Sequence, residues 1–294
     1  MLEYFQTMNV RELIDGHQAV FSFEFFPPKT DEEAKALFGV IAELKTLDPS
    51  FISVTHTPSG IDPLKTAVLA RAIKENYALE PMAHFTCIAH TRSEVREIAA
   101  QLRERGIFNV LALRGDIKPD ARAPIKREYH YAADLVRELS AMGGFCIGVA
   151  GYPEKHPEAP SMEADIARLK EKVEAGASFI VTQLFFDNAY YFSFVEKCRA
   201  AGITVPIVPG IMPVTSHKQI KRFAEMCGSR IPDVMARDLE KIKDDTAAVV
   251  AYGVEHALAQ CRELLKNGVP GIHFYTLNRS HSTMAVLRRL KQGG

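Results

Sequence analysis

Apolar, β-rich runs alternate along the chain with stretches whose apolar residues recur at helical spacing. The first run begins at Val20 and ends before Pro27, because proline cannot donate to a strand ladder. Seven further strands are predicted, over Phe51–Thr55, Met82–Ile88, Ile107–Leu113, Phe145–Ala150, Ser178–Leu184, Thr204–Val208 and Ile272–Leu277. Eight strands, each followed by helical sequence, predict an α/β fold, namely a single TIM-type (β/α)8 barrel.

Two extra helical segments, Pro232–Lys241 and Asp244–Lys266, precede the last predicted strand. No linker interrupts the alternation, so residues 1–294 are expected to form one barrel domain. A doubly wound sheet is the alternative architecture, but neither Gly-x-Gly-x-x-Gly nor a Walker A loop occurs in the sequence.

Glu24 is the unusual residue of the first strand. Phe23 and Phe25 alternate with Ser22 and Glu24, so the carboxylate lies on the face opposite these aromatic rings, near the carboxyl end of the strand. An apolar setting pushes a carboxyl group toward its protonated form, which can donate a proton, unless a partner holds it ionised. A proton donor and a structural glutamate paired with an arginine from a neighbouring strand are both open on this stretch alone.

Composition narrows the class of protein. Lys+Arg and Asp+Glu both number 36, so the net charge of +0 gives no electrostatic case for nucleic acid or an anionic membrane. The five cysteines are odd in number, scattered and never in a Cys-x-x-Cys pair, which indicates reduced core thiols. Residues 1–16 lack an apolar signal core, and no stretch approaches the ~20 apolar residues of a membrane span. We therefore expect a cytoplasmic protein that binds a small ligand.

The predicted strands begin with apolar residues and end with polar ones. In (β/α)8 barrels the chemistry lies at the carboxyl ends of the strands, so these residues are the candidate site. Polar residues also occur wherever loops begin, so the pattern alone does not decide whether these residues form a site. The residues at these ends are Glu24, Thr55, His84, Thr86, Arg114, Gly115, Asp116, Tyr152, Gln183, Pro209, Gly210, Tyr275, Asn278 and Arg279.

Several of the motifs have a structural interpretation beside the functional one. Arg114-Gly115-Asp116 could bind the polar edge of a heterocycle or form a turn with a local ion pair. Gln183 lies on an apolar run and needs hydrogen-bond partners, which a ring amide or a neighbouring backbone could supply. His156 has no second His or Cys at ligand spacing, so no metal site is predicted.

The residues singled out on predicted helices also have a structural interpretation. Ser216 and Gln219 have capping-box spacing, and Phe223, one turn after Gln219, is expected in the core. Asp165 and Lys172 lie two turns apart on one predicted helix and are compatible with two surface charges.

Taken together and in order, the motifs resemble the bacterial methylenetetrahydrofolate reductase family. The resemblance covers nearly the whole chain, and the ordered set is far more specific than any one motif. It implies a (β/α)8 flavoprotein without the regulatory domain of the eukaryotic forms. The motifs are Ser22-Phe23-Glu24-Phe25-Phe26-Pro27-Pro28, Leu113-Arg114-Gly115-Asp116, Tyr152-Pro153-Glu154, His156-Pro157-Glu158, Thr182-Gln183, Phe185-Phe186-Asp187, Pro209-Gly210-Ile211-Met212-Pro213 and His273-Phe274-Tyr275-Thr276-Leu277-Asn278-Arg279.

The resemblance implies a hydride relay and assigns roles to residues. FAD would take a hydride from NAD(P)H and pass it to 5,10-methylenetetrahydrofolate, giving 5-methyltetrahydrofolate. Glu24 would be the general acid that opens the folate's five-membered ring, and Asp116 would lie near the flavin's pyrimidine edge and the pterin. The implied folate residues are Thr55, Gln183, Gln219, Phe223 and Arg279. The implied FAD residues are Thr55, His84, Arg114, Gly115, Asp116, Tyr131, Ala132, Tyr152, His156, Asp165, Arg168 and Lys172.

Two departures from the family pattern stand out. The chain has His56-Thr57-Pro58-Ser59-Gly60 where the family usually has an aromatic residue, then Gly and Ala, which leaves the nicotinamide preference and the direction of the reaction open. Arg168 replaces a smaller polar residue on the adenosine side. A flavin-free barrel enzyme of folate one-carbon units and a flavin- or folate-binding partner subunit without nicotinamide activity are the alternatives, and a homo-oligomer is compatible with the sequence.

Overall fold

The computed structural model describes residues 8–16, 18–56, 63–116 and 128–292. Within them, nine strands form one sheet in the order β7-β6-β5-β4-β3-β2-β1-β9-β8, and every pairing is parallel. The strands are β1 (Val20–Phe25), β2 (Phe51–Val54), β3 (Pro81–Thr86), β4 (Asn109–Leu113), β5 (Cys146–Gly151), β6 (Phe179–Thr182), β7 (Ile207–Val208), β8 (Gly210–Ile211) and β9 (Gly271–Tyr275).

Strands β7 and β8 are two halves of one bent strand, joined at Pro209. Ile207 pairs with Ile180 of β6, whereas Gly210 pairs with His273 of β9. The two ends of the sheet are therefore linked by the chain itself, and the predicted (β/α)8 barrel is confirmed. The predicted seventh strand, Thr204–Val208, was wrong in its bounds, because Pro206 and Pro209 confine ladder bonding to the short pieces 207–208 and 210–211.

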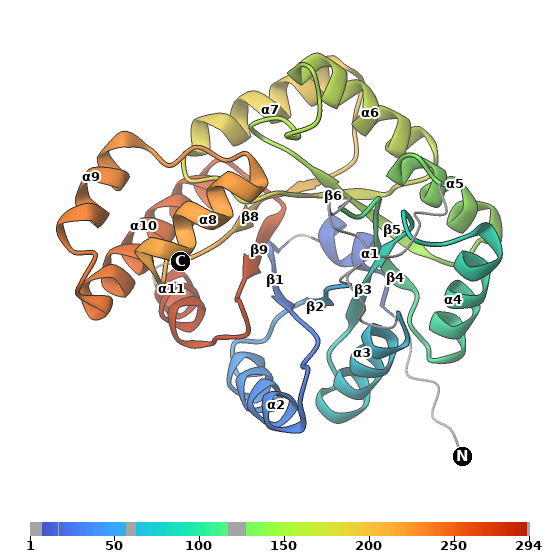
Figure 1. The fold of residues 1–294 in the computed structure, drawn as a ribbon, viewed down its shortest axis with the longest axis horizontal. Coiled ribbons are helices and arrows are strands. Elements are labelled where there is room, and N and C mark those ends of the chain that lie inside the picture. Colours follow the sequence, from blue (N-terminus) through green and yellow to red (C-terminus); the bar gives the residue numbers. More distant parts are fainter. Residues whose placement is uncertain (1–7, 17, 57–62, 117–127, 293–294) are drawn as a thin grey trace.

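Helices surround the ring of strands (Figure 1). The two extra segments predicted before the last strand are present as α9 and α10. The helices after β1 are α2 (Asp31–Lys45), α3 (Pro63–Tyr77), α4 (Arg92–Glu104), α5 (Ala132–Met142), α6 (Met162–Glu174), α7 (Asn188–Ala200), α8 (His217–Cys227), α9 (Asp233–Lys241), α10 (Thr246–Lys266) and α11 (His281–Gln292).

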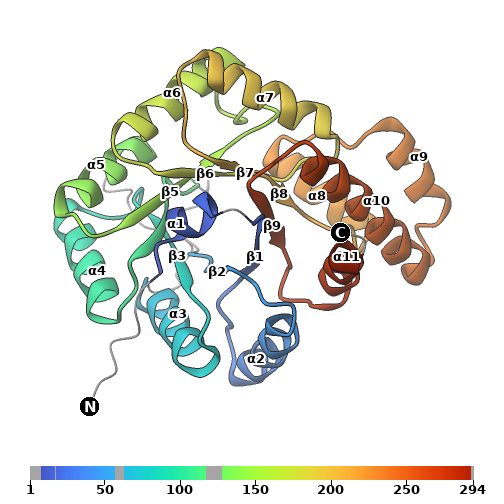
Figure 2. The same cartoon turned by 180° about the vertical axis from the view of Figure 1, so that it is seen from behind.

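A short helix that was not predicted, α1 (Val10–Asp15), covers the amino-terminal end of the barrel, where Figure 2 shows it inside the ring of strands. Val10 and Ile14 pack against interior residues of the strands, including Phe51 and Phe179. The backbone N–H of Val10 donates to Asn109 Oδ1 at 2.9 Å, which fixes the helix to β4. The interior of the barrel is thus filled at this end.

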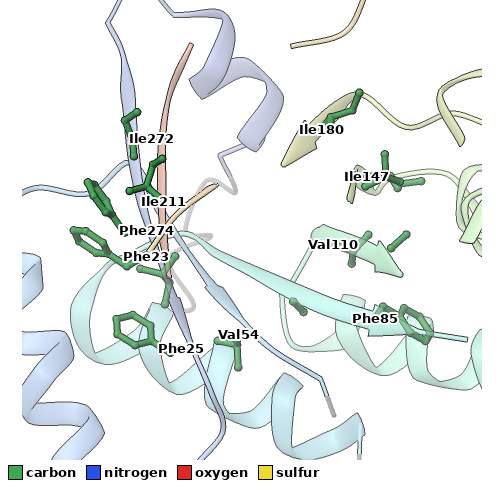
Figure 3. Packing of buried hydrophobic residues seen from close by; sticks show 14 of the residues in the cluster. Phe23, Phe25, Val54, Phe85, Val110, Ile147, Ile180, Ile211, Ile272 and Phe274 are labelled. Carbon is green, nitrogen blue, oxygen red and sulfur yellow. The ribbon is translucent and has the colours of Figure 1, made fainter. Parts of the chain in front are cut away.

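Side chains of the strands alternate between the helices and the barrel interior, as predicted for β1. Phe23 and Phe25 join the core between strands and helices, together with residues such as Phe85, Ile272 and Phe274 (Figure 3). Ser22 and Glu24 consequently point into the barrel. No helix among the described residues is long and apolar enough to cross a membrane.

Candidate functional site

The Glu24 carboxylate meets two histidines inside the barrel. Its Oε2 lies 3.3 Å from His84 Nε2 on β3 and 3.6 Å from His273 Nε2 on β9. All three side chains are buried, and Ser22 Oγ lies 2.7 Å from His273 Nδ1. Parallel register explains the grouping, because Ser22 is the β1 partner of His273 and Glu24 is the partner of Tyr275.

This environment corrects the expectation of an apolar setting for Glu24. Burial alone would raise the pKa of Glu24, but His273 and His84 outweigh it and hold that pKa below its ordinary value. The partners of Glu24 are histidines and not the arginine that was considered. Burial also lowers the pKa of His84, in spite of the neighbouring carboxylate. Glu24 is therefore a strong carboxylic acid flanked by imidazoles.

Tyr275 closes one side of this polar group. Its hydroxyl donates to the Thr182 carbonyl at 2.6 Å, and its ring meets the His273 ring edge to face at 5.4 Å. Burial, together with the nearby Glu24 carboxylate, raises the pKa of Tyr275 well above its usual value. Gly210 is required beside it, since a Cβ there would lie 2.6 Å from the tyrosine ring.

Asp116 lies on the same rim but in a different environment. It is exposed and follows Gly115, whose φ of 89° suits glycine. Burial raises the pKa of Cys227 to about 11, and the charges of Asp116 and Glu24 add to this effect. The two predicted catalytic carboxylates therefore both lie near the end of α8, one buried and the other open to solvent.

A cavity of about 450 Å³ lies on the same rim of the barrel, over the carboxyl ends of β4 and β5. Its lining includes eight of the twelve residues predicted for the cofactor. These are Arg114, Tyr131, Ala132, Tyr152, His156, Asp165, Arg168 and Lys172. These residues come from two consecutive strand–helix units, β4–α5 and β5–α6, which the fold brings to one wall.

Lys172 and Asp165 line this cavity and are not the surface charges that their spacing allowed. The Lys172 ammonium donates to the Ala150 carbonyl at 2.7 Å, and burial lowers its pKa to about 8. Asp165 Oδ2 accepts the backbone N–H of His156 at 2.9 Å. A half-buried ammonium that donates to an uncharged carbonyl is suited to an anionic ligand.

The cationic rim of the cavity is held in place by neighbouring side chains. Arg114 makes a bidentate ion pair with Glu158, at 2.6 and 2.7 Å, in the loop after β5. The Arg168 guanidinium lies over the Tyr131 ring, 4.2 Å from its centre. These contacts hold the guanidinium groups of Arg114 and Arg168 at the edge of the cavity.

The predicted folate residues lie in two places. Gln219 and Arg279 line a second cavity, of about 460 Å³, together with Lys218. The cap predicted for α8 is present, since Ser216 Oγ accepts the backbone N–H of Gln219 at 3.3 Å. Phe223 is half-buried against the apolar cluster under α8, as expected of a core residue.

Gln183 follows β6 directly and is half-buried. Its Oε1 accepts the backbone N–H of Leu184 at 2.8 Å, so a neighbouring backbone, one of the two predicted partners, satisfies it here. The Leu184 backbone would have to release this oxygen before a ring amide could bind both ends of the side chain.

Thr55 and His56 lie at the carboxyl end of β2 and both are buried. Thr55 Oγ1 has no hydrogen-bond partner among the described residues. His56 Nδ1 lies 3.2 Å from Thr86 Oγ1. Thr57, Pro58, Ser59 and Gly60, the rest of the departing loop, lie outside the described residues.

Sequence reasoning placed His84 only with the cofactor and did not single out His273 or Ser22. The available signal was the two-residue period of the strands, which puts Ser22 on the face of Glu24 and His273 on that of Tyr275. Within the described residues there is no group of three or more His, Cys, Asp or Glu that could hold a metal ion.

Comparison with known families gives a match over most of the chain. The family described as methylenetetrahydrofolate reductase matches residues 9–291. The 5,10-methylenetetrahydrofolate reductases of Salmonella typhimurium and Escherichia coli are 43% and 42% identical over 269 residues, covering 92% of this chain and 90% of theirs. The methylenetetrahydrofolate reductase (NADH) 1 of Arabidopsis thaliana is 38% identical over 294 residues, which cover 96% of this chain and 50% of the plant protein.

Two solved structures share the fold at low sequence identity. An uncharacterized protein from Clostridium thermocellum that binds two copies of 5-methyl-5,6,7,8-tetrahydrofolic acid superposes with a TM-score of 0.69 at 15% identity, over 98% of this chain and 100% of that one. Phosphonopyruvate hydrolase in complex with oxalate and Mg²⁺ gives 0.53 at 13% identity, over 97% and 83%.

Proposed function

Because the chain belongs to the methylenetetrahydrofolate reductase family and has that family's activity, we propose that it binds FAD and uses NAD(P)H to reduce 5,10-methylenetetrahydrofolate to 5-methyltetrahydrofolate. The observation that carries this proposal is a buried glutamate, Glu24, at the carboxyl end of β1, on the same rim of the barrel as a cavity that is lined by cationic and aromatic side chains over β4 and β5. We further propose that residues 1–294 act as one catalytic domain.

The cavity over β4 and β5 fits FAD by the chemistry of its lining. Lys172, Arg114 and Arg168 would hold the pyrophosphate and adenosine end, with Tyr131 offering an aromatic face. The unpartnered Thr55 Oγ1 and the neighbouring His84 would meet the isoalloxazine end. When bound, FAD would accept a hydride from NAD(P)H and deliver it to the folate.

Glu24 would donate the proton that opens the five-membered ring of the folate. Its two imidazole contacts are both to Oε2, which leaves Oε1 for the substrate. The imidazoles stabilise the carboxylate that remains after the proton leaves. Because they also hold the pKa of Glu24 below its ordinary value, Glu24 has to take up a proton before each donation. Asp116, exposed on the same rim, would place a negative charge near the cationic intermediate of the folate.

The folate would extend from Glu24 toward α8. Gln183, after release of its oxygen by Leu184, would bind the pterin. Phe223 would pack on the aromatic portion, and the cavity with Gln219 and Arg279 would take the anionic end of the molecule.

Anaerobic titration of the FAD-loaded protein with NADH, followed by methylenetetrahydrofolate, tests the proposal. The flavin band is expected to bleach with NADH and to return when the folate is added, with 5-methyltetrahydrofolate formed. A flavin that stays oxidised with both NADH and NADPH contradicts the nicotinamide half of the proposal. A protein that binds no FAD contradicts the proposal as a whole.

A further inference from the structure

A chain of three buried polar side chains runs from β1 to β9 and back. Ser22 Oγ lies 2.7 Å from His273 Nδ1, and His273 Nε2 lies 3.6 Å from Glu24 Oε2. Ser22 and His273 are fully buried, so water does not compete for their hydrogen bonds. Phe51 stacks on the imidazole, with ring centres 6.2 Å apart, and Tyr275 meets its edge, so the ring is held in one orientation.

The contacts of Ser22 select the tautomer of His273. A buried hydroxyl needs an acceptor for its proton, and the contact recorded for Ser22 Oγ is with Nδ1 of this imidazole. If Ser22 donates to Nδ1, the ring proton of neutral His273 lies on Nε2, which faces Glu24 Oε2 at 3.6 Å and Ser53 Oγ at 3.5 Å. An N–H directed at a carboxylate stabilises its ionised form.

We propose that His273 is a positioning residue that makes Glu24 a stronger acid, and that Ser22 fixes the imidazole so that its Nε2–H faces the carboxylate. The inference rests on the proposed function for its role in the reaction. In the proton transfer, the O–H bond of Glu24 breaks and an N–H bond forms on the folate. The electron pair stays on the carboxylate, where the Nε2–H of His273 stabilises it.

The other polar groups around Glu24 are not held toward its carboxylate as His273 is. His84, from β3, approaches Oε2 at 3.3 Å, but its Nε2 makes no well-formed hydrogen bond within the described part of the chain. Tyr275, from β9, is bound to the Thr182 carbonyl, and Cys227 lies at the end of α8. Of the two histidines beside Glu24, His273 is thus the one whose orientation is fixed by another side chain, Ser22.

The first test measures the protonation of Glu24 in the protein without substrate. The carboxylic-acid carbonyl band in infrared pH-difference spectra is assigned to Glu24 by its loss in Glu24→Gln. His273→Leu, which removes the N–H, is expected to move the midpoint of this band upward by roughly one pH unit. His273→Gln restores an uncharged N–H donor and is expected to keep the midpoint close to that of the wild type.

Ser22→Ala and Ser53→Ala form the matched pair. Each removes one fully buried hydroxyl near the same imidazole, but Ser53 Oγ lies 3.5 Å from Nε2 and does not contact Nδ1. Ser22→Ala is expected to raise the midpoint, because the imidazole can then carry its proton on Nδ1. Ser53→Ala is expected not to raise it: Ser53 Oγ competes with Glu24 for the Nε2–H, so its removal leaves the midpoint in place or lowers it. Circular dichroism confirms that each variant is folded.

The second test follows the folate half-reaction of the FAD-loaded protein against pH. In His273→Leu the maximal rate is expected to fall while the midpoint of the descending limb moves to higher pH, since a weaker acid keeps its proton longer but gives it up more slowly. A merely structural loss would lower the rate without moving that midpoint.

The outcomes separate the two proposals. An infrared midpoint that is the same in wild type, His273→Leu and Ser22→Ala overturns the inference, whatever the enzyme reduces. A shifted midpoint in a protein that reduces no folate supports the coupling of His273 to Glu24 and contradicts the proposed function instead.

Discussion

The guanidinium of Arg168 lies 4.2 Å from the centre of the Tyr131 ring, and both side chains line the cavity over β4 and β5. Arg168 is half-exposed and also pairs with Glu171 at 2.9 Å on its own helix. The stack presents a flat cationic surface at the cavity edge, in the position where a smaller residue was expected. This arrangement makes Arg168 a candidate for strengthening cofactor binding in this chain.

Replacing Arg168 by Ala is expected to raise the dissociation constant for FAD about threefold, because an exposed cation–π contact is weak. Fluorescence quenching of FAD on binding measures the change. Glu171→Gln, which removes the exposed ion pair and keeps the stack, is the control and is expected to bind FAD like the wild type. Equal affinity in Arg168→Ala and the wild type would exclude the stack from binding.

The pKa of Lys172, about 8 in the free protein, predicts a pH dependence of FAD binding. Below pH 8 the ammonium is charged and ready for the pyrophosphate. Above pH 8 the free protein loses this proton, whereas a bound anion favours its retention, so binding must take up a proton and weakens as pH rises. We expect a constant dissociation constant below pH 8 and a rising one above it, measured by the same quenching assay.

Lys172→Met is expected to bind FAD at least about tenfold more weakly and to lose the rise above pH 8. Lys170→Met is the matched control, since Lys170 is on the same helix, pairs with Glu174 at 3.8 Å and does not line the cavity. A pH profile that is the same in wild type and Lys172→Met would show that another group titrates.

The sequence predicted those features that depend on local pattern. The alternation of Phe23 and Phe25 with Glu24 predicted which face of β1 enters the barrel, and the strand ends predicted the rim on which Glu24 and Arg114 lie. The bounds predicted for the seventh strand were wrong. Its prolines limit the ladder hydrogen bonds to two short pieces, β7 and β8, which pair with different neighbours, β6 and β9. Local pattern carries no information about which neighbour a short strand will find.

The interior of the site depended on register and could not be predicted in this way. His273 reaches Glu24 because β1 and β9, about 250 residues apart in sequence, pair with Ser22 opposite His273. The spacing of Asp165 and Lys172 on α6 was equally compatible with solvent, and only the packing of α6 against β5 brings the lysine to the Ala150 carbonyl and partly buries it. Tertiary contacts, and not propensity, decided both cases.

Asn109 is expected to be important for stability at the other end of the barrel. It is fully buried, accepts the N–H of Val10 at 2.9 Å and donates to Met8 O at 3.0 Å and Glu80 Oε1 at 2.9 Å. Asn109→Ala leaves these groups without their partner, so we expect a loss of about 2–3 kcal/mol in the free energy of unfolding. Thermal unfolding and the hydrogen exchange of α1 measure the loss and its location.

Asn267→Ala is the matched control for this prediction. The Asn267 side chain donates to the Glu263 carbonyl at 2.8 Å on the surface, so its removal is expected to cost less than about 0.5 kcal/mol. If the two variants unfold at the same temperature, the contacts of Asn109 do not hold α1 in place.

Glu24→Gln is expected to separate the two half-reactions of the proposed enzyme. The amide keeps the shape of the side chain but has no acidic proton, so the reduction of bound FAD by NADH should continue while the folate half-reaction slows by about 10² to 10⁴-fold. Stopped-flow absorbance of the flavin measures each half-reaction in the same preparation, and the NADH step reports whether the variant is intact.

Glu80→Gln provides a second buried glutamate for comparison, at the amino-terminal end of the barrel. Burial raises the pKa of Glu80 even though Lys74 lies 3.2 Å away, and the residue is remote from the rim that carries Glu24. Its replacement is expected to change neither half-reaction by more than about twofold. Folate reduction at the wild-type rate in Glu24→Gln would remove Glu24 as the acid, and the proton would then have to come from Asp116 or from water.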